Sequence, residues 1–233
     1  MKKNKIIATA LYWLFILSFP LLLVTTTVRG EVNCARLYEY GFDNNVSQTT
    51  ALNSTQLSAI AQRLIGFFNS RVETPRMNVT NVYGEEFELF NDYELVHLDD
   101  VKRLFRLNSL VQESVLVYIA IYILLFFLVM KRRWRDLVRG IMWGCVLTLA
   151  LVGGLGLAAL FFFEEMFIQF HLVVFPNLYW LLDPTRDYLI MLFPEGFWMD
   201  VVYIGAGLVA AEALLSGGLA GAIPRKIKSQ NAK

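Results

Sequence analysis

Residues 141–163 read IMWGCVLTLALVGGLGLAALFFF, and no charged side chain interrupts this apolar run. A helix of about 20 apolar residues spans the hydrocarbon core of a bilayer, so the run is long enough to cross it. Further apolar runs lie at 6–28, 115–130 and 201–223. The four runs predict a mainly α membrane protein with four transmembrane helices.

The composition also favours a membrane location. Hydrophobic residues make up 56% of the 233 residues and charged residues 18%, and the mean hydropathy is +0.49. Soluble domains have a more polar balance. The run 6–28 is longer than the apolar part of a secretory signal peptide, and no small-residue cleavage site follows it. We therefore expect it to remain as an anchor in the cell membrane.

Basic residues gather on one side of the predicted topology. Segments 1–5, 131–140 and 224–233 hold 12 of the 21 Lys and Arg residues and a single acid, Asp136. Cytoplasmic loops of membrane proteins carry such an excess of positive charge, so we expect both termini in the cytoplasm. The predicted transmembrane helices are a first at 1–28 with its N terminus inside, a second at 115–130, a third at 141–163 and a fourth at 201–223. Two extracellular parts connect them, a module at 29–114 and an interfacial segment at 164–200. The cytoplasmic parts are a basic link at 131–140 and a tail at 224–233.

The extracellular module has the patterns of a small α+β unit. Apolar residues recur at helical spacing after Asn53, Ser54 and Thr55, any of which can cap the helix. Residues 77–90 alternate in places around Gly84, which predicts a short hairpin.

A later helix of the module is predicted to begin at Asp99 or Asp100, directly after His97. The polar pair 108–109 is a plausible break in this helix. A bend there would lay residues 99–107 on the membrane surface and bring His97 to the membrane plane.

The interfacial segment 164–200 is rich in aromatic residues, whose rings suit the boundary between membrane and water. Pro176, Pro184 and Pro194 divide it, which excludes one regular helix. We expect it to lie along the outer leaflet or to cover the helices. Within the third helix, the glycines of GGLGLAAL at 153–160 predict close contact with another helix.

Common catalytic signatures are missing from the sequence. It contains no G-x-S-x-G, H-E-x-x-H, C-x-x-C, Walker A or dinucleotide-binding motif. Basic clusters lie only at the predicted cytoplasmic helix ends, so binding of nucleic acid is not supported. The chain has only two histidines, His97 and His171, and both fall in the predicted extracellular segments.

His171 lies in the stretch EEMFIQFHLVVFPN at 164–177. In a helix, the apolar residues three and four positions away on both sides would share its face. Desolvation there favours the neutral imidazole, which is the state that a general base needs. The alternative is a structural histidine that is hydrogen-bonded to a backbone carbonyl.

Two further groups suggest sites. His97, Asp99, Asp100 and His171 have the donor types of a hydrolytic zinc site, although they come from separate segments without a recognisable spacing. Glu212 is the one acid deep inside a predicted transmembrane helix. It is either a functional carboxylate or a hydrogen-bonded packing residue.

Two segments resemble one family. VHLDDVKRLF at 96–105 and FFFEEMFIQFHLVVFPNLYWLLDPTRDYLIMLFPEGFWMD at 161–200 look like the signature segments of the lipoprotein intramolecular transacylases (Lit) of Gram-positive bacteria. The likeness covers nearly the whole chain. It implies an acyltransferase that moves the sn-2 acyl chain of a diacylglyceryl lipoprotein onto the α-amine of its own N-terminal cysteine, giving a lyso-form lipoprotein. It also implies His97 and His171 as catalytic residues at the outer leaflet.

The resemblance further implies no cofactor and no metal, with a diacylated lipoprotein and membrane lipids as partners. A neutral His171 suits deprotonation of an α-amine whose pKa is about 8, while His97 serves the departing glyceryl oxygen or the oxyanion. Two alternatives remain: a non-enzymatic four-helix membrane protein that binds a lipid or protein partner, and a metal-dependent lipid hydrolase. The candidate substrate-binding or orienting residues are Asp100, Arg103, Asn177, Asp183, Arg186 and Asp187.

Overall fold

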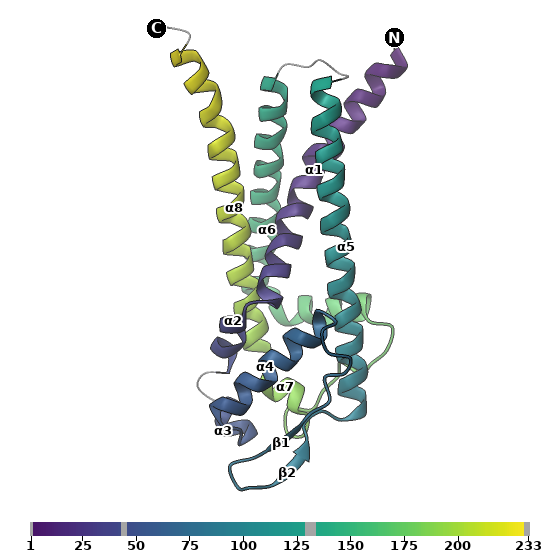
Figure 1. Cartoon of the computed structure of the whole chain (residues 1–233), viewed down its shortest axis with the longest axis vertical. Helices are drawn as coiled ribbons and strands as arrows, with labels where there is room; N and C mark the ends of the chain where they lie inside the picture. Colours follow the sequence, from purple (N-terminus) through teal and green to yellow (C-terminus); the bar gives the residue numbers. More distant parts are fainter. Residues whose placement is uncertain (1, 43–45, 129–133, 231–233) are drawn as a thin grey trace. The chain divides into compact units, whose positions relative to one another are not determined.

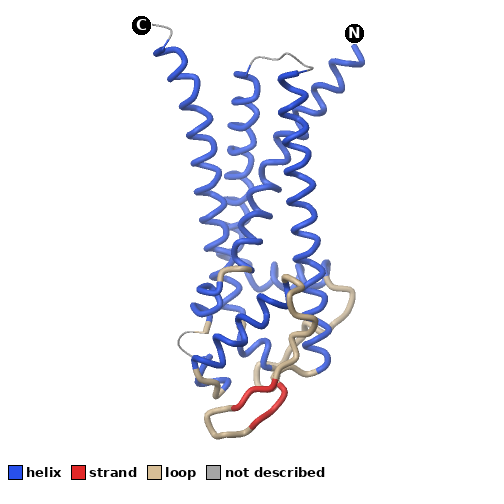
Figure 2. The backbone as a smooth tube through the Cα atoms, viewed as in Figure 1, coloured by secondary structure: helices blue, strands red, loops and turns tan. Residues whose placement is uncertain are grey.

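The computed structural model describes residues 2–42, 46–128 and 134–230. Figure 1 labels its elements, and Figure 2 shows that the described chain is helical except for one short sheet and the loops; the sheet has two strands. Parts of the predicted second helix, basic link and tail, at 129–133 and 231–233, lie outside the described residues. In chain order the elements are α1 (Lys2–Val32), α2 (Ala35–Gly41), α3 (Val46–Thr50), α4 (Ser54–Phe68), β1 (Asn78–Thr80), β2 (Glu86–Glu88), α5 (Asp92–Leu128), α6 (Trp134–Val174), α7 (Tyr188–Leu192) and α8 (Glu195–Gln230).

Four helices of the described chain, α1, α5, α6 and α8, are long and apolar enough to cross a membrane. The mean hydropathy of their most apolar windows lies between 1.6 and 2.4. The predicted fold class, a mainly α integral membrane protein with four transmembrane helices, is therefore confirmed. All four helices extend beyond the predicted apolar runs, because helical hydrogen bonding continues into the polar residues that flank each run.

The chain divides into two compact units. One, the bundle unit, comprises Met1–Val28, Asn108–Ala158 and Ile204–Lys233. The other, the histidine unit, comprises Arg29–Leu107 and Ala159–Tyr203 and contains both histidines. Each of the four long helices contributes residues to both units.

In the bundle unit, aromatic rings join α1 to α5. The rings of Phe15 and Tyr122 stack with their centroids 4.5 Å apart, and Phe126 is fully buried beside them. The hydroxyl of Tyr118 donates a hydrogen bond to the carbonyl oxygen of Leu11 at 2.7 Å. Ring packing and a satisfied hydroxyl thus hold these two helices together.

Glycine allows α6 to pack closely on α1. A Cβ added at Gly144 would lie 2.7 Å from Cβ and Cγ of Phe19. The contact predicted for the glycines of GGLGLAAL is wrong in the described chain, because a Cβ added at Gly153, Gly154 or Gly156 meets nothing within 4 Å. Glycines give a helix a flat face on which another helix can pack closely. They do not determine which helix packs there, or whether one does.

Substitution of Gly144 by alanine should destabilise the bundle unit. The new methyl group would push against Phe19 close to its backbone, and overpacking of this kind typically costs about 1–3 kcal/mol. Thermal unfolding in detergent should show a lower Tm for Gly144→Ala. Gly154→Ala, with open space around it, should leave the Tm unchanged or raise it, and equal losses in both variants would contradict this account.

Polar side chains form hydrogen bonds between helices of the bundle unit. Nδ2 of Asn108 donates to the carbonyl oxygen of Thr25 at 3.0 Å, and Nε2 of Gln112 donates to Oγ1 of Thr26 at 2.9 Å. The break predicted at 108–109, with the bend it would cause, is wrong: α5 continues from Asp92 to Leu128. The Asn108 amide is used between helices instead of competing for the backbone of its own helix.

Glu212 of α8 also forms a hydrogen bond to another helix. Its Oε2 accepts a hydrogen bond of 3.5 Å from Oγ1 of Thr27, a buried residue of α1. Interhelical hydrogen bonds of this kind stabilise helix pairs in membranes. This contact favours the interpretation of Glu212 as a packing residue.

In the histidine unit, α4 forms the centre of the core. Asn53 caps this helix through a capping box with Gln56, which confirms one of the three predicted caps. The buried face of the helix packs against α2 and belongs to one core cluster with residues of α7 and of the start of α5. The predicted hairpin is also confirmed: β1 and β2 pair antiparallel with Val79 opposite Phe87, and Gly84 has the positive φ of +85° that a turn favours in glycine.

The segment 164–200 is divided as its prolines predict. Helix α6 continues to Val174 and stops before Pro176. Non-helical backbone interrupts α6 at Phe162 (φ −137°, ψ 32°), close to the predicted end of the third apolar run. The short helix α7 follows, and α8 begins directly after Pro194.

Candidate active site

The two histidines of the chain lie side by side in the histidine unit. His97 belongs to α5 and His171 to the last turn of α6. Their ring centroids are 6.1 Å apart with the ring planes inclined by 34°, and each residue is only 8% exposed. Residues 74 positions apart in the sequence are therefore brought together.

His97 is placed by the start of α5. Asn91 and Glu94 form a capping box, with the backbone N–H of Asn91 donating to Oε2 of Glu94 at 2.7 Å and the backbone N–H of Glu94 donating to Oδ1 of Asn91 at 3.1 Å. The other oxygen of Glu94 accepts the backbone N–H of Leu189 at 2.7 Å. The buried Glu94 carboxylate thus joins the start of α5 to the start of α7, one turn before His97. The predicted helix start at Asp99 or Asp100 is wrong, because this earlier capping box begins the helix.

His171 is oriented by its own helix. Nδ1 lies 2.6 Å from the carbonyl oxygen of Phe167. Because a carbonyl oxygen only accepts, Nδ1 carries the proton in this bond, and a neutral ring then has its lone pair at Nε2. The hydrogen bond expected for a structural histidine is present, and it also prepares Nε2 to act as a base.

Aromatic rings surround the pair. The ring centroid of His171 lies 4.2 Å from that of Phe167, 5.3 Å from that of Phe175 and 4.9 Å from that of Trp180. Phe175 also contacts His97, with the centroids 4.9 Å apart. Such apolar surroundings disfavour the charged imidazolium, so both rings are suited to the neutral state.

Three of the predicted orienting residues form one hydrogen-bonded group. Oδ2 of Asp100 accepts from Nδ2 of Asn177 at 2.7 Å, and Oδ1 accepts from Nη1 of Arg103 at 3.1 Å. Asp100 is one turn after His97, and Asn177 follows the end of the helix that carries His171. This group therefore joins the two segments that bear the histidines.

The other three predicted residues form a second group. Asp187 is fully buried and accepts hydrogen bonds from the backbone N–H of Asp183 at 2.7 Å and from Nε of Arg186 at 3.2 Å. It also accepts from Nδ2 of Asn91 at 3.3 Å and from the hydroxyl of Tyr93. Burial by itself would raise the pKa of Asp187, but these hydrogen bonds and the nearby guanidinium bring its pKa below the usual value. The ionised carboxylate fixes the loop before α7 to the first turn of α5.

Substitution of Asp187 by asparagine should destabilise the histidine unit by about 2–3 kcal/mol, because four donors then lose the charged acceptor that this buried side chain provides. The pKa of the native carboxyl is lowered, so its stabilisation is present at neutral pH and is lost as the pH falls through that value. Thermal unfolding at pH 7 measures the effect. Asp183→Asn changes an exposed neighbour and should shift the Tm far less; similar shifts in both variants would contradict the prediction.

The family can now be stated from comparison with known proteins. The family described as lipoprotein intramolecular transacylase Lit matches residues 13–198 of this chain. The chain belongs to this family. No curated protein matches it significantly.

Solved structures of one Lit protein share the fold. The in meso structure of the membrane integral Lit of Bacillus cereus superposes with a TM-score of 0.76 at 19% identity, over 95% of this chain and 97% of that one. Two structures of the same protein with one histidine replaced, by arginine or by alanine, also have a TM-score of 0.76 at 18% identity, and each covers 98% of this chain. As a member of the Lit family, the chain is an integral membrane acyltransferase that acts on lipoproteins.

Sequence reasoning missed several residues around the site of this Lit-family protein. Asn91 and Glu94 have the spacing of a capping box, a signal that the sequence does contain. The Tyr93 hydroxyl and the Trp180 ring carry no such signal, because their partners lie on segments far away in the sequence. In the sequence, Trp180 stands out only as one of the aromatic residues of the interfacial segment 164–200.

The donor set for a metal is not assembled around the histidines of this Lit-family chain. Across the described residues, no group of three or more His, Cys, Asp and Glu side chains is placed to hold a metal ion. Asp99 is exposed, and both oxygens of Asp100 are occupied by Asn177 and Arg103.

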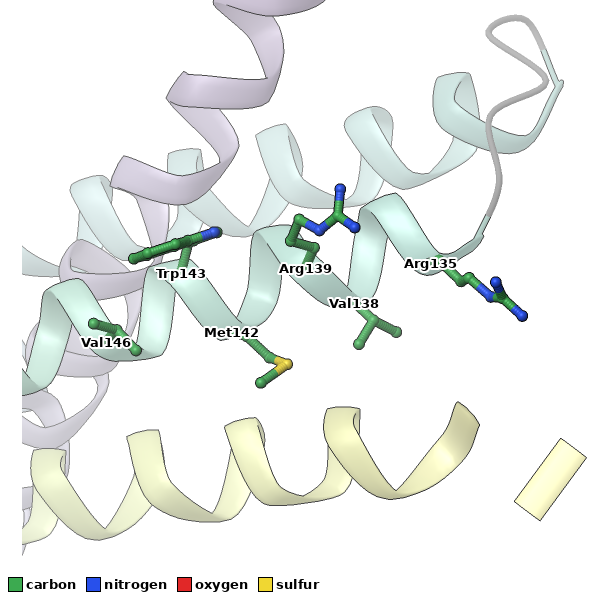
Figure 3. A pocket seen from close by; sticks show the side chains of 6 residues that line it. All are labelled: Arg135, Val138, Arg139, Met142, Trp143 and Val146. Atoms are coloured by element: carbon green, nitrogen blue, oxygen red, sulfur yellow. The ribbon is translucent and has the colours of Figure 1, made fainter. Parts of the chain in front are cut away.

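A hollow of about 450 Å³ opens on α6 in the bundle unit of the Lit-family chain. Figure 3 shows the two arginines and four apolar side chains that line it along one helix. None of these side chains offers the base that acyl transfer from an amine needs. The lining residues are Arg135, Val138, Arg139, Met142, Trp143 and Val146.

Proposed function

We propose that this chain transfers the sn-2 acyl chain of a diacylglyceryl lipoprotein to the α-amine of the lipoprotein's own N-terminal cysteine, with His97 and His171 as the catalytic residues. The observation that carries the proposal is the pairing of the only two histidines of the chain, buried and 6.1 Å apart. The product is a lyso-form lipoprotein with an N-acyl, S-monoacylglyceryl cysteine.

The reaction requires proton transfers and no enzyme nucleophile. The amine nitrogen attacks the ester carbonyl carbon, the carbon–oxygen bond to the glyceryl group breaks, and an amide and a free glyceryl hydroxyl result. One proton leaves the amine and one is added to the glyceryl oxygen, so the reaction is balanced without a co-reactant. Because amine and ester belong to one substrate, holding them in an attack geometry provides much of the rate.

His171 is assigned as the base. Its Nδ1 is engaged with Phe167, which leaves Nε2 to take the proton of the amine. His97 is assigned to the departing glyceryl oxygen, since its ring lies beside that of His171 and a second imidazole can return the proton.

The two hydrogen-bonded groups are proposed to position these rings. Asp100, Asn177 and Arg103 join the segments that carry the histidines. Asp187 accepts from the backbone N–H of Asp183 and from Arg186, and it secures the start of α5 through Asn91 and Tyr93, a short distance before His97 along the helix. In this assignment none of the six exchanges protons with the substrate.

The topology completes the proposal. The basic segments 1–5, 131–140 and 224–233 support cytoplasmic termini by the positive-inside rule. The segments 29–114 and 164–200, which carry the histidines, are then extracellular, and the site works at the outer leaflet, where diacylated lipoproteins are anchored. The proposed transmembrane segments are residues 1–28, 115–130, 141–163 and 201–223.

Expression in a host that makes only diacylated lipoproteins tests the proposal. Mass spectrometry of a reporter lipoprotein should show an unchanged total mass, with one acyl chain now on the α-amine and the amine no longer reactive toward an amine label. A free α-amine after expression of the protein, verified in the membrane fraction, would falsify intramolecular transfer. Loss of an acyl chain that depends on added metal would indicate the hydrolase instead.

A further inference from the structure

Trp180 lies against the proposed base. Its ring centroid is 4.9 Å from that of His171, with the planes inclined by 37°. The Trp180 ring is partly exposed, but its Nε1 is buried and has no hydrogen-bond partner among the described residues. An indole N–H only donates, so the place beside this nitrogen suits an acceptor oxygen.

The same setting contains a second buried polar atom without a partner. Nδ1 of His97 also lacks a hydrogen bond within the described chain, and its ring contacts that of His171. Buried donors and acceptors are nearly always paired in native proteins. Two such atoms on rings that contact one histidine indicate that a polar ligand completes the site.

The backbone around Trp180 is held in place. Asn177 donates to Asp100 through its side-chain nitrogen and accepts the backbone N–H of Tyr179 at 3.0 Å through its oxygen. A further backbone bond, from Leu181 N–H to Leu178 at 3.1 Å, closes the turn that contains Trp180. The backbone that carries the indole is therefore held in place, and the ring itself packs against His171, as preorganisation of a transition-state donor requires.

We propose that Nε1–H of Trp180 donates a hydrogen bond to the carbonyl oxygen of the acyl ester under attack. As the carbon–nitrogen bond forms, the carbonyl electron pair moves onto this oxygen, and the indole N–H stabilises the negative charge until the bond to the glyceryl oxygen breaks. A neutral donor suits these aromatic surroundings, because no charge has to be removed from water. This inference rests on the proposed function and leaves His97 to serve the leaving oxygen.

Trp180→Phe tests the inference, because phenylalanine retains a ring against His171 and lacks the N–H. The rate of N-acylation should fall by about 100- to 1,000-fold, the loss typical for removal of one oxyanion donor. The fall should be in kcat with KM little changed, since the bond strengthens only in the transition state. Trp198→Phe removes an indole that packs on Phe193 and Phe197 and should retain the unsubstituted rate.

A second measurement does not depend on turnover. In protein labelled with ¹⁵N at tryptophan, the indole resonance that Trp180→Phe removes should shift when a lipopeptide amide product is added. It should not shift with an ether analogue that lacks the carbonyl. If Trp180→Phe lowers the amount of folded protein, the shift in the unsubstituted protein shows whether the Trp180 N–H donates to the carbonyl oxygen.

The outcomes separate the two proposals. Full activity of Trp180→Phe overturns the role of Trp180, and so does an indole resonance that responds in the same way to the amide product and to the ether analogue. The histidine mechanism stands in both cases. Absence of any N-acylated lipoprotein with the unsubstituted protein overturns the proposed function itself.

Discussion

Replacement of His171 by alanine should abolish N-acylation of the reporter lipoprotein. Its Nε2 is the proposed base, and general acid–base catalysis typically contributes about 100- to 10,000-fold to a rate. A loss of that size leaves the lipoprotein with a free α-amine on the time scale of growth. Mass spectrometry of the reporter N terminus, alongside the amount of the variant in membranes, measures the effect.

One further substitution, His171→Asn, distinguishes catalysis by His171 from support of the fold. His171→Asn retains an N–H near the position of Nδ1, where it can donate to Phe167, but has no nitrogen lone pair near Nε2. If the ring works as a base, His171→Asn is well folded and as inactive as the alanine variant. Recovery of activity in His171→Asn would show that the hydrogen bond to Phe167 is the whole contribution of this residue.

Replacement of His97 by alanine should cause a loss of similar size. The departing glyceryl oxygen is a poor leaving group unless it receives a proton, and the proposal gives this transfer to the imidazole beside His171. The double variant His97→Ala/His171→Ala should be no worse than either single variant, because residues that act as one unit are strongly non-additive. The same mass-spectrometric assay, with purified protein and a synthetic lipopeptide, gives the three rates.

A matched control for His97 is Asp99→Asn. This neighbour is exposed on the same helix and belongs only to the metal interpretation. It should retain the full rate, and addition of a chelator should leave that rate unchanged. Strong loss in Asp99→Asn with restoration by a divalent metal would contradict the two-histidine mechanism and favour the hydrolase.

Local patterns were sufficient to predict much of the fold. The four apolar runs predicted the four long helices because a bilayer demands both length and hydropathy of each span. The Asn53 cap and the hairpin around Gly84 were predicted because both depend on neighbours within a few residues. The two histidines were found as candidates because they are the only ones in the chain, and the family resemblance assigned them a role.

Other features depended on partners far away in the sequence. The pair 108–109 looked like a helix break because asparagine and serine are weak helix formers, yet the Asn108 amide reaches Thr25 and α5 continues. The close contact with α1 falls at Gly144 and not in the glycine-rich stretch. Each outcome follows from which helix packs opposite, and periodicity within a single helix does not contain that information.

By itself, the sequence determined the four long apolar helices, the Asn53 cap, the hairpin and the choice of His97 and His171 as candidates, since each depends on local composition, spacing or a recognisable segment. Only the tertiary structure decided that the two imidazoles lie 6.1 Å apart, that Nδ1 of His171 is engaged, and that Trp180 brings a buried N–H to the same place. The reason is physical: burial and hydrogen-bond geometry are properties of atoms brought together from distant segments, and no short stretch of the chain specifies them alone.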